Sequence, residues 1–133
     1  MIRTCTALLL LQLTTFTFAA DWSQFRGADG QGISAARQLP IQWGPEKNVA
    51  WKVAVPGQGW SSPIVHQGRI YLTAAVPVDE ASEDRSLRLI CLDGENGETI
   101  WNTEIFRQEG ETAPRIHSKN SHASPTPVIH DGH

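Results

Sequence analysis

The chain has little cysteine, no cluster of basic residues and, beyond its first twenty positions, no long hydrophobic run. Of its 133 residues two are cysteines, and one of them, Cys5, lies within those first twenty. The other, Cys91, has no partner for an internal disulfide. The formal net charge is −3 and the Lys and Arg residues are scattered, which excludes the concentrated positive surface that nucleic-acid binding needs. We therefore expect no nucleic-acid partner.

The first twenty residues have a character of their own. Arg3 gives them a positive start, residues 7–13 are almost wholly apolar, and Ala19 and Ala20 are the small residues that a signal peptidase requires. The apolar part is shorter than the roughly 20 residues that a membrane-spanning helix needs. We expect residues 1–20 to be a signal peptide. The mature protein is then exported, periplasmic or extracellular, with no membrane span after cleavage.

Helical periodicity is missing from the rest of the chain, and the pattern found there predicts β-structure. Residues 21–49 are rich in Gly, Gln and Pro and predict an extended lead-in. Gln67-Gly68 fits a two-residue hairpin connection, and a Gly-rich turn follows residue 92. We predict an all-β protein, with short alternating segments forming strands at residues 50–55, 62–66, 69–75, 87–92 and 99–105.

Two segments of the sequence resemble one another, which indicates an internal repeat. Residues 62–69 read Ser-Pro-Ile-Val-His-Gln-Gly-Arg, and residues 126–133 read Thr-Pro-Val-Ile-His-Asp-Gly-His, with every equivalent pair 64 positions apart. A shorter similarity aligns Trp51 with Trp101, 50 positions later. The second unit therefore carries a longer insertion. Short strands that recur every ~40–50 residues are typical of β-propeller blades.

Residues 89–101 carry a more specific likeness. Leu-Ile-Cys-Leu-Asp-Gly-Glu-Asn-Gly-Glu-Thr-Ile-Trp resembles the pyrroloquinoline-quinone (PQQ) repeat: an apolar strand, Leu-Asp, an Asn-Gly turn and then Trp. The start of the lead-in, residues 21–27, is also similar to exported proteins of this PQQ-like β-propeller family, such as the outer-membrane assembly factor of the BamB type. The resemblance implies that Trp101, and Trp51 before it, dock between blades, while Asp93, Asn96 and Gly97 fix the hairpin.

The resemblance implies a partial propeller. Residues 50–133 correspond to one complete four-stranded blade and the start of a second, about one and a half blades, whereas a closed ring has ~4–8. We expect an N-terminal fragment of a longer protein. Its partners are then other proteins or the remaining blades of the same propeller.

Two functions remain open at this point. The first is a non-catalytic binding or assembly scaffold. The second is the N-terminal part of a PQQ-dependent alcohol or sugar dehydrogenase, whose quinone and calcium site would lie in further C-terminal blades. Residues 93–97 are too short for a calcium loop, and no adjacent cysteine pair occurs. We therefore expect no cofactor, metal or catalytic residue in this segment, which favours the scaffold.

The insertion before the second copy contains a candidate ligand loop. Two readings are open: a loop whose side chains hydrogen-bond to neighbouring blades, and a site for an anionic ligand or a metal ion. Two histidines without a third ligand nearby favour the hydrogen-bonding loop over a metal site. The residues of the loop that could contact a ligand are Arg115, His117, Lys119, Asn120 and His122.

Overall fold

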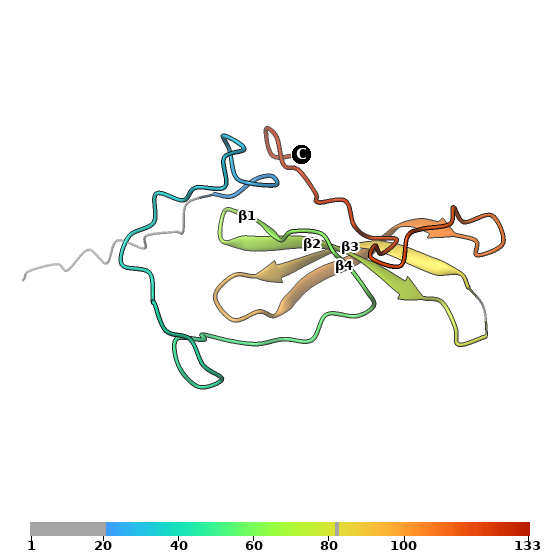
Figure 1. Ribbon diagram of the computed structural model, residues 1–133, viewed down its shortest axis with the longest axis horizontal. Coiled ribbons are helices and arrows are strands. Elements are labelled where there is room, and N and C mark those ends of the chain that lie inside the picture. Colours follow the sequence, from blue (N-terminus) through green and yellow to red (C-terminus); the bar gives the residue numbers. More distant parts are fainter. Residues whose placement is uncertain (1–20, 82) are drawn as a thin grey trace, which may run out of the picture.

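A single antiparallel sheet forms the centre of the molecule. The computed structural model describes residues 21–81 and 83–133, so the predicted signal peptide lies outside the described residues. The strands follow one another across the sheet in chain order (Figure 1). They are β1 (Ile64–His66), β2 (Arg69–Pro77), β3 (Arg85–Asp93) and β4 (Thr99–Gln108). Within the described ranges there is no helix, and hence none able to cross a membrane. The prediction of an all-β protein is confirmed.

The turn between β1 and β2 follows from its two residues. Gln67 and Gly68 both have positive φ, 49° and 73°, as the tightest hairpin connection requires. His66 then pairs directly with Arg69. The predicted hairpin is confirmed, and its register places the apolar residues of β1 and β2 on the sheet in a fixed order.

The sheet has one covered face and one partly open face. Strand alternation puts Ala74, Ile90 and Leu92 on the covered face, where they are almost fully buried and Val55 packs against them. Leu87 and Leu89 lie on the other face and are only half-buried. We call these the core face and the open face. The open face is defined by Tyr71, Thr73, Leu87, Leu89, Cys91, Trp101 and Phe106.

The strand predicted over residues 50–55 does not form, so this prediction is wrong. The backbone there is irregular, although Val55 reaches the core as the alternation requires. The segment lies over the core face, against which Val55 packs, rather than along an edge of the sheet. A backbone that crosses a face has no neighbouring strand with which to form ladder hydrogen bonds. After this segment the chain reaches the edge of β2 at Gln58, which pairs with Ala75.

The outermost strand, β4, is irregular, because its pairing with β3 shifts register twice. The shifts leave Ile100 and Ile105 as extra residues, and their side chains are exposed. Such bulges increase the local twist of a strand and are common at sheet edges. Among the described residues β4 pairs only with β3, so its outer edge is open.

Candidate functional site

The turn between β3 and β4 is held by its own side chains. Asp93 Oδ1 accepts hydrogen bonds from the backbone N–H groups of Glu95 (2.8 Å) and Asn96 (3.2 Å). Asn96 Oδ1 accepts one from the N–H of Glu98 at 2.8 Å. Short carboxylate and amide side chains stabilise turns in this way, because they satisfy backbone donors that the strands leave free. These hydrogen bonds hold the β3–β4 turn in a defined conformation.

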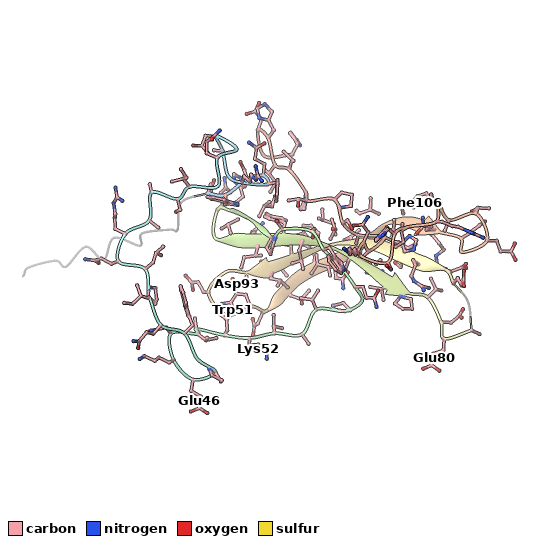
Figure 2. All side chains as sticks on the ribbon, viewed as in Figure 1. Glu46, Trp51, Lys52, Glu80, Asp93 and Phe106 are labelled. Carbon is pink, nitrogen blue, oxygen red and sulfur yellow. The ribbon has the colours of Figure 1, made fainter. Side chains whose placement is uncertain are left out.

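Trp51 packs against the β3–β4 turn. Its indole Nε1 donates to the carbonyl oxygen of Gly94 at 3.1 Å. Gly97 has φ 76°, and a Cβ placed there would lie 2.6 Å from Cε3 of Trp51. Only glycine allows both the backbone conformation and the close approach of the ring. Figure 2 shows Trp51 beside Asp93, with Lys52 directed away from the sheet.

The structure thus brings together four of the five motif residues singled out in the sequence: Trp51, Asp93, Asn96 and Gly97. The fifth, Trp101, lies on β4, on the open face. Its ring centroid is 5.9 Å from that of Tyr71, with the planes inclined at 56°. Trp101 therefore contacts its own sheet and leaves part of its surface uncovered.

The candidate ligand loop does not gather its charged residues at one point. Arg115, His117, Lys119 and Asn120 are exposed, and only His122 is half-buried. His117 Nδ1 accepts a hydrogen bond from the N–H of Lys119 at 3.1 Å, so this ring is engaged in its own turn. No group of three or more His, Cys, Asp or Glu side chains within the described part of the chain is placed to hold a metal ion.

The end of this loop is joined to the sheet by backbone acceptors. Thr73 Oγ1 lies within hydrogen-bonding distance of the carbonyl oxygens of Ala123 (3.2 Å) and Pro125 (3.0 Å). The N–H of Trp60 donates to the carbonyl oxygen of Ala123 at 3.1 Å. Ala123 and the neighbouring Ser121 are buried as a result. The loop therefore docks on the edge of β2.

Two hollows flank His122. The first, of about 310 Å³, lies on the open face and is mainly apolar, with Leu87, Leu89 and Phe106 among its lining residues. The second, of about 500 Å³, is polar and mixes charges of both signs; it is lined in part by Glu83, Arg85, Glu111 and Arg115. Of the candidate loop, Arg115 and His122 both line this second hollow.

A polar network on β3 and β4 was not predicted from the sequence. Arg88 donates to Oδ1 of Asn102 (2.6 Å), to its carbonyl oxygen (2.9 Å) and to Oγ of Ser86 (3.0 Å). The Ser86 hydroxyl in turn donates to Glu104. This hydrogen bond, together with that from Arg107 at 3.3 Å, lowers the pKa of the Glu104 carboxyl. Alternating polar residues in both strands are its one sequence signal, and the register shift hides which of them meet.

The second copy of the repeat reproduces the first turn. Asp131 and Gly132 have φ 49° and 78°, close to those of Gln67 and Gly68. The backbones of His130 and His133 exchange two hydrogen bonds of 2.9 Å, as expected for the pair that closes a two-residue turn. Both copies of the repeated segment thus form the same turn.

Equivalent positions of the two copies also touch. The N–H of Ser62 donates to Oγ1 of Thr126, its counterpart 64 positions later, at 3.0 Å. Residues 62 and 126, one in each copy, are therefore neighbours in space, although only the first copy forms a strand there, β1. Comparisons with protein-family models, with curated proteins and with solved structures find no match to this chain.

Proposed function

We propose that this chain is part of an exported β-propeller of the PQQ-like repeat type, which acts as a non-catalytic binding or assembly scaffold. The observation that carries the proposal is the hydrogen bond between Ser62 and Thr126. A contact between equivalent positions is what successive units around an axis produce, and the shared turn geometry at residues 67–68 and 131–132 supports the same arrangement.

The motif around Trp51 supports the proposal from another side. Trp51 precedes the sheet and caps its β3–β4 turn, while Trp101 occupies the equivalent position 50 residues later. In a propeller, Trp101 would cap the corresponding turn of the next blade. Its half-exposed ring is available for such a contact.

The open surfaces favour a protein partner or further blades. Ile105 and Phe106 are 66% and 59% exposed, at the margin of the apolar hollow on the open face. Exposed apolar side chains that line a hollow are characteristic of surfaces that another protein element covers. Together with the unpaired edge of β4, these side chains favour packing or strand pairing with a further protein element.

The side chains of the described residues favour binding over covalent chemistry. The thiol of Cys91 is 0% exposed, and burial raises its pKa above the ordinary value, so it is a poor nucleophile. Ser86 is hydrogen-bonded to a carboxylate that is itself paired with Arg107, and no histidine lies in that network. The network stabilises the sheet.

Thermal unfolding followed by circular dichroism tests the proposal. The purified protein is heated alone, with calcium, with PQQ and with both, and its midpoint is compared across the four conditions. A scaffold gives the same midpoint in all of them. A midpoint raised only by PQQ and calcium together would contradict the proposal and favour the alternative, the N-terminal part of a PQQ-dependent dehydrogenase, because a ligand that binds the folded state stabilises it.

A further inference from the structure

The contact between the repeat copies locates the axis of the proposed propeller. When units are arranged around an axis, the distance between equivalent points grows in proportion to their distance from that axis. Ser62 and Thr126 are equivalent and lie within hydrogen-bonding distance, 3.0 Å. In the proposed arrangement, β1 and the equivalent segment of the second copy, residues 126–130, therefore lie close to the axis.

The start of the lead-in is hydrogen-bonded to both β1 and the equivalent segment of the second copy. Trp22 exchanges two backbone hydrogen bonds with Val65, of 2.7 and 2.9 Å. The next residue, Ser23, accepts a hydrogen bond of 2.9 Å from the N–H of Ile129. Val65 and Ile129 are equivalent positions of the repeat. Figure 1 shows the blue start of the described chain close to the red C-terminal segment, next to β1.

Side chains fasten this segment at both of its ends. Asp21 Oδ1 accepts a hydrogen bond from the N–H of Gln67 at 2.9 Å, and Asp21 Oδ2 lies 2.7 Å from Nδ1 of His66. Further along, the ring of Trp22 lies so close to Gly27 that a Cβ there would meet it at 2.9 Å. Gln24 closes the bend by donating to the carbonyl oxygen of Gly27 at 3.0 Å.

We propose that residues 21–27 are a clasp: through residues 21–23 they bind β1 and the equivalent segment of the second copy at once, and they fill the space next to the axis. This inference rests on the propeller arrangement proposed above and deepens it. The clasp joins the two units in the way that a shared strand would. It also occupies the position that a ligand held on the axis beside these segments would need. The scaffold therefore presents its outer surfaces, and not its axis, to partners.

Hydrogen exchange of single amides, measured by NMR on the whole purified protein, tests the clasp. The two reporters are the N–H groups of Val65 and Ile129. We expect both to exchange at least about tenfold more slowly than unstructured amides. Trp22→Ala should speed both by about the same factor, whereas Trp43→Ala, which removes a 66% exposed ring of the lead-in, should speed neither. Asp21→Ala is the milder variant should Trp22→Ala fail to fold.

The outcomes separate the clasp from the scaffold. An unprotected Ile129 amide in the unaltered protein, or a variant at Trp22 that affects Val65 alone, would overturn the shared clasp whatever the protein's function. A second titration adds PQQ and calcium to the unaltered protein. Loss of protection at both reporters would show that the ligand displaces the clasp, and would overturn its exclusive hold on the axis. Unchanged protection together with a raised unfolding midpoint would leave the clasp in place and contradict the scaffold instead.

Discussion

Gln67-Gly68 and Asp131-Gly132 occupy equivalent positions of the repeat, and their backbones have nearly the same conformation. Their surroundings differ. In the first copy the turn leads into β2, and the strand before it contains Ile64, which is 0% exposed. In the second copy the residue equivalent to Ile64 is Val128, and it is 59% exposed. The turn is therefore encoded locally, while burial depends on having a sheet to join.

This difference separates two kinds of information in the sequence. A pair of residues that favours positive φ specifies a turn wherever it occurs. A strand of three or four residues, by contrast, gains most of its stability from the side chains it packs against. The two copies can therefore be used as matched controls for one another.

The largest expected effect comes from removing the buried side chain of the first copy. Ile64→Ala should lower the free energy of unfolding by about 2–5 kcal/mol, because it leaves a cavity among packed residues. Val128→Ala, the equivalent change in the second copy, should alter it by less than about 0.5 kcal/mol. Urea unfolding followed by tryptophan fluorescence measures both. A comparable loss in the two variants would show that the second copy is as well packed as the first.

The next effect concerns a turn that is capped. Gly97→Ala should reduce stability by about 2–4 kcal/mol, since it combines an unfavourable positive φ with overlap against the ring of Trp51. Gly132 has a similar φ, but no atom lies within 4 Å of an added Cβ and its turn lies outside the sheet, so Gly132→Ala should leave the unfolding midpoint unchanged. If the two variants unfold at the same urea concentration, the close contact of Trp51 with the turn does not exist in solution.

A smaller effect is expected at the shared turn. Gly68→Ala should lower the free energy of unfolding by about 1–2 kcal/mol, because the left-handed backbone conformation at this position is unfavourable for alanine. The pairing of β1 with β2 depends on this turn. In the second copy the same change should disturb only the turn itself. NMR chemical shifts of residues 129–133 would report that local change, and the unfolding midpoint would stay where it is. A shifted midpoint would mean that the second turn is already coupled to the sheet.

Much of the sheet could be predicted because its signals are local. The Gln-Gly pair and the Asp93 turn are marked by residues that act within their own few positions, and the alternation of β2 to β4 shows directly which residues share a face. The strand predicted at residues 50–55 failed because alternation also fits a chain that merely touches the core. Trp51 and Val55 do point inward, but the sequence does not tell whether a neighbour supplies backbone hydrogen bonds.

The candidate site was harder to predict because its contacts span long distances in the chain. His117 and His122 are five positions apart, yet one is engaged in its own turn and the other lies between two hollows. The network of Arg88 with Asn102 depends on a register shift between β3 and β4 that no residue marks. Similarly, nothing in residues 21–23 indicates that they form hydrogen bonds with segments more than forty positions away.

The smallest expected effect tests whether the charge of Glu104, in the polar network of β3 and β4, contributes to stability. The pKa of Glu104 lies below its ordinary value of 4.5, mainly because Ser86 donates a hydrogen bond to the carboxylate. Its contribution is therefore present above pH 4.5 and is lost as the pH falls through the folded-state pKa. The unaltered protein should be slightly more stable than Glu104→Gln at pH 7, and the gap should close as the solution becomes more acidic. Glu46→Gln, on the lead-in, should leave the unfolding midpoint unchanged throughout. A gap that is constant from pH 7 to pH 3 would show that Glu104 stabilises β4 by packing alone.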